Sequence, residues 1–275
     1  MNQEQKNKVA IVTGAGKGIG RAIAISLAKQ GMDIVLGSRT QKDLEQVAKE
    51  IESLGRKALP VICDVSKEKD VSNLISIAVS RFPTIDLLVN NAAIQGPVGR
   101  LWQNNVKEWE KTIQINLLGV FYISHLVIPY MLKQKSGRII NLSGGGAAYA
   151  RPLFSAYSCS KTAILRLTET LAEELKGKNV QVFALAPGAT WTEMTKEAMQ
   201  KSIKIKNKKN LDELKMIQAS GGTSNIKHEK AASYLLSEDS KKLSGKLLHV
   251  DEIDKIQKTS FKMKQDSGKL RRVDY

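Results

Sequence analysis

The chain has 275 residues, of which 42% are hydrophobic, and carries a formal net charge of +16. This apolar content supports a sizeable core, and two cysteines make no disulfide framework, so the fibrous, disordered and disulfide-stapled classes are excluded. The N-terminus is polar and lacks the apolar stretch of a signal peptide, and no apolar run is long enough for a membrane span. We therefore expect a cytoplasmic protein without a transmembrane helix.

The positive charge is unevenly distributed, because half of the excess lies in residues 196–275. A basic surface can face nucleic acid, a membrane or an anionic substrate. No nucleic-acid motif accompanies the charge, so we favour a solvated lysine-rich surface. Neither nucleic acid nor a membrane is expected as a partner.

Short β-branched runs alternate with helix-length amphipathic segments. The predicted strands are nearly continuously apolar, as strands covered on both faces should be; they cover residues 9–12, 34–36, 59–62, 87–89, 138–142 and 180–185. Helical periodicity marks residues 18–30, 41–54, 67–81, 106–133 and 156–176. Repeated β-α-β units with right-handed crossovers predict an α/β fold, a single doubly wound Rossmann-type parallel sheet with helices on both faces.

The pattern loosens after Thr195. A lysine-rich helical segment leads to a break at Gly221-Gly222, a short helix over 227–236 and a strand over 246–250. We expect one domain over residues 1–275, a substrate lid over 191–224 and a peripheral polar tail over 255–275.

A glycine-rich loop, T-G-A-G-K-G-I-G at residues 13–20, follows the first strand and opens the first helix. Glycines at such a joint permit a tight turn and let backbone N–H groups approach a pyrophosphate at the helix N-terminus. The loop therefore predicts a dinucleotide site. Its candidate cofactor-binding residues are Gly14, Gly16, Lys17, Gly18, Ile19 and Gly20.

The spacing T-G-x-x-x-G-I-G resembles the short, non-extended form of the short-chain dehydrogenase/reductase family. Further motifs follow in the family's order: C-D-V at 63–65, N-N-A-A at 90–93, N at 116, Y-S-C-S-K at 157–161 and P-G-A-T-W-T at 187–192. The resemblance covers residues 7–195 and weakens beyond them. It implies an oxidoreductase that moves a hydride between a nicotinamide and a ketone or secondary alcohol.

The end of the second strand indicates which cofactor is used. An acidic residue there would bond the ribose hydroxyls and repel a 2′-phosphate. This chain has Ser38 and Arg39 instead, and a guanidinium offers a planar fork of donors to phosphate. Lys17 adds a second positive charge, so the sequence favours NADP(H). The alternative is that both cations are simply exposed.

The resemblance also implies the other cofactor contacts. The aspartate of C-D-V would contact the adenine, the backbone of N-N-A-A would line the cofactor, and a threonine after P-G would reach the nicotinamide carboxamide. The residues at these positions are Asp64, Val65, Asn91, Ala92, Pro187, Gly188, Thr190 and Thr192.

Tyr157 and Lys161 are four residues apart, on one face of a helix. A phenol with a pKa near 10 is a poor acid–base group at neutral pH, and a neighbouring ammonium, helped by the positive nicotinamide ring, would lower that pKa. Tyr157 could then give a proton to a carbonyl oxygen, while Lys161 also holds the nicotinamide ribose. The resemblance further implies that Asn116 positions a water in a relay to Lys161.

The family's substrate-orienting serine commonly stands 13 residues before the tyrosine, where this chain has Gly144. Either the loop carries one extra residue and Ser143 points at the substrate carbonyl, or another donor such as Ser155 substitutes. Three consecutive glycines make a bulge inexpensive, so we favour Ser143.

The leading hypothesis is an NADPH-dependent reductase of ketones, with 3-oxoacyl thioesters among the substrate classes. A non-catalytic NADP(H)-binding or sensing protein is the alternative, but it would not need Tyr157 and Lys161. The lysines over 201–209 could attract an anionic substrate or simply be solvated. No His, Cys and acidic cluster has metal spacing, so no metal is expected. A homodimer through the helices bearing Asn116 and Tyr157 is expected, with a tetramer as the alternative.

Overall fold

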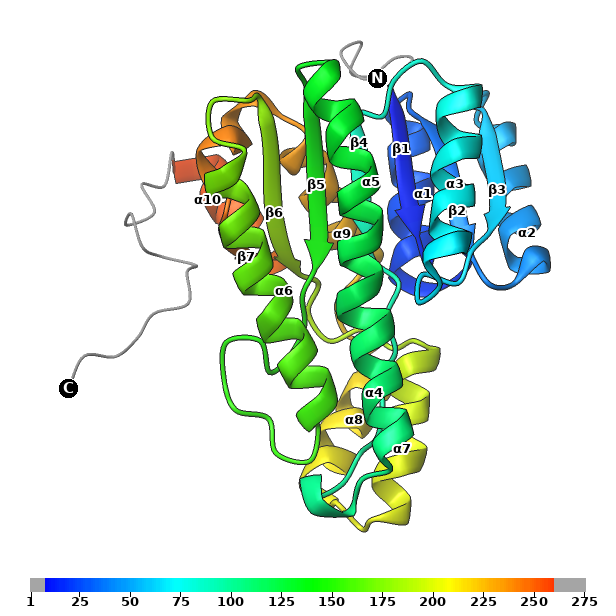
Figure 1. Cartoon of the computed structure of the whole chain (residues 1–275). Helices are drawn as coiled ribbons and strands as arrows, with labels where there is room; N and C mark the ends of the chain where they lie inside the picture. Colours follow the sequence, from blue (N-terminus) through cyan, green and yellow to red (C-terminus); the bar gives the residue numbers. More distant parts are fainter. Residues whose placement is uncertain (1–7, 260–275) are drawn as a thin grey trace.

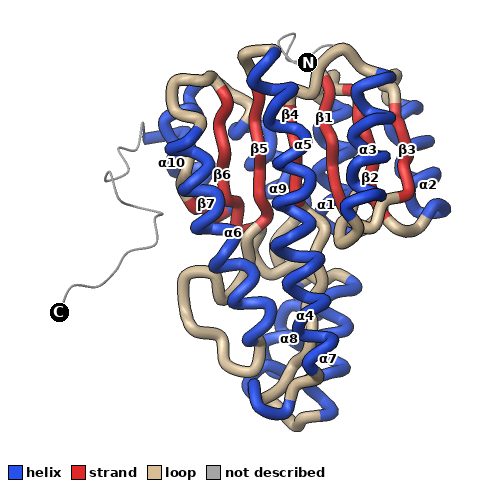
Figure 2. The backbone as a smooth tube through the Cα atoms, in the orientation of Figure 1, coloured by secondary structure: helices blue, strands red, loops and turns tan. Residues whose placement is uncertain are grey.

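The computed structural model describes residues 8–259. Its centre is a seven-stranded parallel sheet in the order β3-β2-β1-β4-β5-β6-β7 (Figures 1 and 2). The strands are β1 Val9–Thr13, β2 Asp33–Ser38, β3 Ala58–Ile62, β4 Leu87–Asn90, β5 Gly137–Leu142, β6 Val180–Ala186 and β7 Leu247–His249. The predicted fold class is confirmed, and each predicted strand lies within two residues of the observed one.

Helices cover both faces of the sheet. One face packs against α1 Gly18–Lys29, α2 Gln41–Ser53, α9 Asn225–Leu235 and the start of α10 Ile253–Thr259. The other packs against α3 Glu68–Arg81, α5 Gly119–Lys133 and α6 Ser155–Glu174 (Figure 1). This arrangement explains the continuous apolar runs, because alternate side chains of each strand enter two separate cores.

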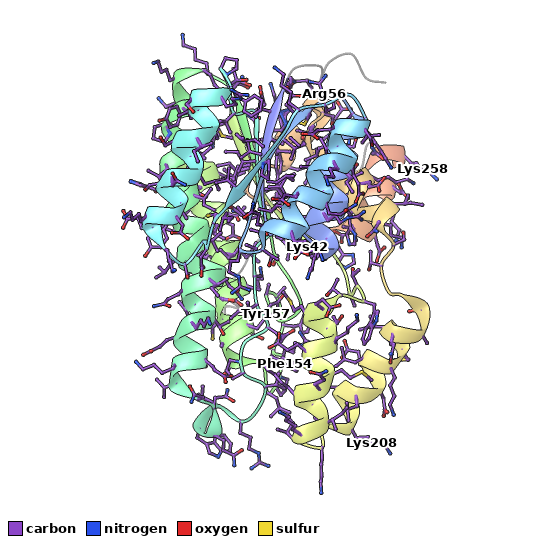
Figure 3. The ribbon with its side chains drawn as sticks, turned by 90° about the vertical axis from the view of Figure 1, so that its right-hand side faces the viewer. Lys42, Arg56, Phe154, Tyr157, Lys208 and Lys258 are labelled. Carbon is purple, nitrogen blue, oxygen red and sulfur yellow. The ribbon has the colours of Figure 1, made fainter. Side chains whose placement is uncertain are left out.

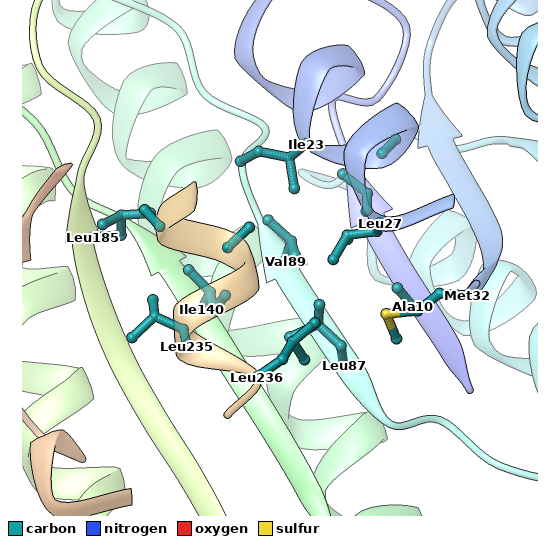
Figure 4. Packing of buried hydrophobic residues seen from close by; sticks show 14 of the residues in the cluster. Ala10, Ile23, Leu27, Met32, Leu87, Val89, Ile140, Leu185, Leu235 and Leu236 are labelled. Carbon is teal, nitrogen blue, oxygen red and sulfur yellow. The ribbon is translucent and has the colours of Figure 1, made fainter. Parts of the chain in front are cut away.

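The central strands show the alternation directly. Leu87, Val89 and Ile140 pack beneath α1 and α9 (Figure 4). Leu88 and Ile139 point the opposite way, into the core under α3, α5 and α6. All five side chains are at most 1% exposed, so this part of the sheet forms a rigid support for the loops at its edge.

One long helix runs from Val106 to Lys133 and comprises α4 Val106–Ile113, a π-helical turn Gln114–Leu118 and α5. By length and composition it could cross a membrane, although the sequence predicts no such helix. The inner side chains of α5, among them Ile123 and Met131, are buried against the sheet. A core helix passes the same test, so the feature is weak evidence for a membrane span.

The segment after β6 forms a separate pair of helices, α7 Glu193–Lys204 and α8 Lys208–Ser220. They lie beyond the carboxyl ends of the strands (Figure 1), where the sequence predicts a lid. A bridge between Thr190 and Gly222 joins the two ends of the segment. Within the predicted peripheral tail, Ile256 is 5% exposed and belongs to the core; residues 260–275 of that tail lie outside the described part.

Candidate active site

A trough crosses the carboxyl ends of the strands, over the point between β1 and β4 where the strand order reverses. Ligands of doubly wound sheets bind at such a point. Two adjoining cavities of about 280 and 520 Å³ share glycine-loop residues and form the trough. It brings together most predicted site residues: Gly14, Gly16, Lys17, Gly18, Ile19, Ser38, Arg39, Asp64, Val65, Asn91, Ala92, Ser143, Tyr157, Lys161, Pro187 and Thr192.

Asn91 fixes the glycine loop against the neighbouring strand. Its side-chain amide donates to the carbonyl oxygens of Thr13 at 2.9 Å and Gly14 at 3.2 Å. The Thr13 hydroxyl in turn accepts from the backbone N–H groups of Asn91 and Ala92, at 3.0 and 3.1 Å. Gly14 has a φ of +62°, which glycine adopts without strain. The bare backbone and the N-terminus of α1 fit a dinucleotide pyrophosphate.

Gly20 does not line the trough and has a packing role instead. A Cβ at this position would lie 2.3 Å from the Gly14 carbonyl oxygen and 2.4 Å from the Asn91 amide nitrogen. Glycine at position 20 therefore lets α1 approach the loop closely.

The adenosine end of the trough contains Ser38, Arg39 and Asp64, as predicted, together with Asp43, which the sequence analysis missed. The Lys17 ammonium lies 3.1 Å from the Asp43 carboxylate, so one of the two predicted phosphate-binding cations already has a partner. Burial acts to raise the pKa of Asp64, but hydrogen bonds from Ser66 and the charge of Arg39 outweigh it and hold the pKa below its usual value.

Tyr157 and Lys161 lie together at the other end of the trough, on the inner face of α6. The Lys161 ammonium donates to the Leu142 carbonyl oxygen at 2.7 Å and lies 5.7 Å from the centre of the Tyr157 ring. Figure 3 shows Tyr157 at the level where the sheet gives way to the α7–α8 pair. The two side chains are thus positioned between the glycine loop and the lid.

Burial and the charge of Arg151 act in opposite directions on the pKa of Tyr157. Burial raises it, the charge of Arg151 lowers it and Tyr149 raises it, with burial the largest effect. Lys161 is not among the causes, and burial lowers the pKa of Lys161 itself to about 8. The expectation that Lys161, together with the nicotinamide ring, lowers the phenol pKa stays a prediction; here the Lys161 ammonium donates to the Leu142 carbonyl oxygen.

Asn116 lies in the π-helical turn and is fully buried, outside the trough. Its side chain accepts from the Ile94 N–H and donates to the Ile94 carbonyl, both at 2.9 Å, and donates to the Ser160 hydroxyl at 3.1 Å. It thereby connects α6 to the segment after β4. The water relay implied for Asn116 stays a prediction, although π-turns are frequent at functional sites.

Ser143 lines the trough, and its hydroxyl is buried without a partner among the described residues. However, Gly144 is the residue that faces Tyr157, since a Cβ there would lie 2.4 Å from the phenol oxygen. Ser155, the other donor considered, accepts from the Trp109 indole at 3.1 Å. Ser143 therefore remains the candidate orienting hydroxyl, but it is not the residue directly against the phenol.

His228 is a further residue of the site region that the sequence left without a role. It is 0% exposed, and its Nε2 lies 2.8 Å from the Pro187 carbonyl oxygen, so this nitrogen carries the donated proton. Thr190 turns toward His228, at 3.4 Å, and neither Thr190 nor Gly188 lines the trough. The imidazole thus stabilises the loop after β6 through the Pro187 carbonyl, on the side of the loop away from the trough.

The His228→Gln variant is expected to lose less stability on acidification than the wild type. Burial lowers the pKa of His228, while the Pro187 hydrogen bond acts to raise it. The unfolded chain therefore takes up this proton first, and stability falls as pH drops below about 6.5. Unfolding temperatures at pH 7.5 and 5.5 measure the effect. Equal losses for both proteins would show that His228 does not contribute.

No cluster of three potential metal ligands occurs within residues 8–259. Cys63 borders the adenosine end, but burial raises the pKa of its thiol to about 12. A protonated thiol is a poor nucleophile and ligand, so Cys63 acts as a small buried side chain.

Comparison with known proteins agrees with this geometry. The short chain dehydrogenase family matches residues 8–203. The 3-oxoacyl-[acyl-carrier-protein] reductase of Thermotoga maritima is 34% identical over 197 residues, covering 72% of this chain and 80% of that protein. The chain therefore belongs to the short-chain dehydrogenase family, and it is an oxidoreductase by that membership.

Two solved structures show how closely the fold is shared. NAD⁺-bound xylitol dehydrogenase has a TM-score of 0.83 and 29% identity, covering 90% of this chain and 98% of its own. An actinorhodin polyketide ketoreductase variant with NADPH has a TM-score of 0.82 and 28% identity, covering 91% and 97%. These two relatives carry different nicotinamide cofactors, so the choice of cofactor depends on the residues of this chain.

Proposed function

We propose that this protein is an NADP(H)-dependent reductase of ketones, or the reverse dehydrogenase of secondary alcohols. The observation that carries the proposal is the placement of Tyr157 and Lys161 at one end of a trough that continues past the glycine loop to Ser38 and Arg39. Incubation with NADPH and a panel of ketones, aldehydes and 3-oxoacyl thioesters tests it. Oxidation of NADPH by at least one carbonyl compound is expected.

The residues divide the chemistry between them. The bound nicotinamide would supply the hydride, and Tyr157 would donate its phenolic proton to the carbonyl oxygen. Burial raises the pKa of Tyr157, so the phenol is protonated at neutral pH, as a proton donor must be. Lys161 would hold the nicotinamide ribose and stabilise the phenolate that remains. Ser143 would orient the carbonyl oxygen.

A non-catalytic NADP(H)-binding protein is the alternative. It would require the glycine loop but no acid–base pair inside the trough. Here Lys161 is 3% exposed and Tyr157 is 8% exposed. Burying an ammonium without its own carboxylate is costly, so its presence at the trough favours the enzyme.

Wild-type protein is expected to bind NADPH more tightly than NADH. Arg39 is exposed at the adenosine end and has no ion pair within the described residues, so its guanidinium is available to a 2′-phosphate. Arg39→Asp should reverse the preference, because a carboxylate repels phosphate and bonds ribose hydroxyls. Titration of both cofactors decides. Tighter binding of NADH by the wild type would refute the proposed cofactor.

Ser143→Ala is expected to lower kcat/KM by at least about tenfold, which is about 1.4 kcal/mol of transition-state stabilisation. The buried, unpartnered hydroxyl of Ser143 suits a group that receives its hydrogen-bond partner from the substrate. Steady-state kinetics with a confirmed ketone measures the change. An unchanged kcat/KM would remove Ser143 from the site.

We further propose that the protein is a cytoplasmic homodimer or homotetramer. Large apolar side chains on the outer side of the long helix are exposed, with Phe121 at 47% and Tyr130 at 41%. A second copy packed on this surface would cover them.

A further inference from the structure

Gly144 and Gly145, in the loop between β5 and α6, lie beneath the side chains of Tyr157, Tyr149 and Arg151. Gly144 lies under the Tyr157 hydroxyl, with 2.4 Å between the phenol oxygen and the place of a Cβ. At Gly145 the corresponding place lies 3.0 Å from the Tyr149 hydroxyl and 3.6 Å from a guanidinium nitrogen of Arg151. Neither glycine has a side chain that could separate the catalytic phenol from the Arg151 cation.

Arg151 is held in position by an aromatic ring. The carbon of its guanidinium lies 4.0 Å from the centre of the Phe154 ring, a distance at which a cation and a ring attract each other. Phe154 is 2% exposed and therefore fixed. In the view of Figure 3, Phe154 lies just below Tyr157.

The guanidinium has donors to spare. No hydrogen bond or ion pair engages it among residues 8–259, whereas Arg56 and Arg138 are each paired with a carboxylate. Its charge nevertheless reaches the catalytic phenol, since Arg151 acts to lower the pKa of Tyr157 against the larger effect of burial. Arg151 is half-buried, lies next to Gly145 and has no carboxylate partner among the described residues, and a guanidinium with free donors is suited to an anionic ligand.

We propose that Arg151 binds the carboxylate of the substrate, so that the protein acts on oxo acids whose ketone lies a few bonds from the carboxyl group. The inference rests on the proposed ketone reduction and adds the substrate class to it. A guanidinium matches a carboxylate with two parallel N–H donors. Because Gly144 faces the Tyr157 hydroxyl and the adjacent Gly145 faces Arg151, a carboxylate held by Arg151 would leave the rest of the substrate to extend toward the phenol.

The lysines of the lid are a less suitable site for the substrate carboxylate than Arg151. Lys201 donates to the Gly96 carbonyl oxygen at 2.9 Å and pairs with Glu197 at 2.7 Å. Its charge is therefore already used within the protein. Arg151 differs because it combines a fixed position with unused donors.

The test compares a series of oxo acids with their methyl esters, using NADPH oxidation by the wild type, Arg151→Met and Arg151→Lys. The wild type should prefer the acid. Arg151→Met should lower kcat/KM for the acid about thirtyfold and change that for the ester by less than about threefold. Arg151→Lys should recover part of the loss, because it restores charge without the fork. Equal losses for acid and ester, or no loss for the acid, would overturn the proposal.

Arg100→Met is the matched control, since Arg100 also stacks on an aromatic ring, 5.5 Å from the centre of Trp102, and is exposed. The Arg100→Met variant should have the wild-type kcat/KM for both the acid and the ester. A second measurement separates the proposed carboxylate site from the proposed ketone reduction. It uses the saturated carboxylic acid, which has no ketone, and its binding is measured as a rise in the unfolding temperature of the NADPH-loaded protein. A rise in the wild type but not in Arg151→Met supports the carboxylate site even where no ketone is reduced. No rise in the wild type contradicts it.

Discussion

Replacing Tyr157 with phenylalanine is expected to lower kcat about 10²- to 10⁴-fold, the contribution typical of a positioned general acid. The phenyl ring would keep the buried packing of Tyr157, which is 8% exposed, and only the proton donor would be lost. Because the ring stays in place, the affinity for NADPH should change by less than about twofold. Single-turnover rates and cofactor titrations of the same preparations measure both quantities.

Tyr130→Phe provides the control, since Tyr130 is 41% exposed on α5, outside the trough. It should retain wild-type kcat. A Tyr157→Phe variant that turns over at the wild-type rate would show that the proton comes from another group. Circular dichroism of each variant ensures that only folded proteins are compared.

Gly20→Ala is expected to abolish cofactor binding and to lower the free energy of unfolding by about 1–3 kcal/mol, the usual cost of overpacking. The added methyl group would collide with the Gly14 carbonyl oxygen at 2.3 Å and with the Asn91 amide. The first of these atoms is backbone and cannot rotate away, so α1 must move from the loop. NADPH titration and denaturant unfolding measure the two effects.

Lys29→Ala, at the exposed end of the same helix, is the control for Gly20→Ala and should bind NADPH normally. Wild-type NADPH affinity in Gly20→Ala would contradict the close packing of α1 on the glycine loop. Loss of stability without loss of binding would show that the loop tolerates the shift.

The sheet could be predicted from the sequence because its strands are buried on both faces. Runs such as residues 9–12 and 180–185 are apolar without interruption, and only a parallel sheet between helix layers buries such runs. The glycine loop was predictable for a similar reason, since its spacing reports a backbone requirement. The strands and the glycine loop can both be recognised from residues that are close together in the sequence.

The parts of the site that escaped prediction depend on contacts between distant residues. Lys17, just before α1, pairs with Asp43 in the first turn of α2, and His228 of α9 bonds to the Pro187 carbonyl. No local sequence pattern predicts either contact. A four-residue spacing places Tyr157 and Lys161 on one helix face, but it does not reveal the hydrogen-bond partner of the ammonium, which is the Leu142 carbonyl.

The position of Ser143 shows the same limit at a finer scale. Counting residues leaves two registers open, and a shift of one residue changes which side chain meets the phenol. The structure places Gly144 against Tyr157 and Ser143 in the trough with an unpartnered hydroxyl. A local register is set by the packing of the whole loop, which the sequence does not report.

Transfer of deuterium from NADPH that carries deuterium at both positions of the nicotinamide C4 tests hydride transfer and Tyr157 catalysis together. The wild type, loaded with labelled cofactor and mixed with a ketone that it reduces, should give an alcohol with deuterium on the carbinol carbon. Tyr157→Phe, equally loaded, should give almost no alcohol over the same time. An alcohol without deuterium on that carbon, or equal product from the phenylalanine variant, would contradict the proposed reaction.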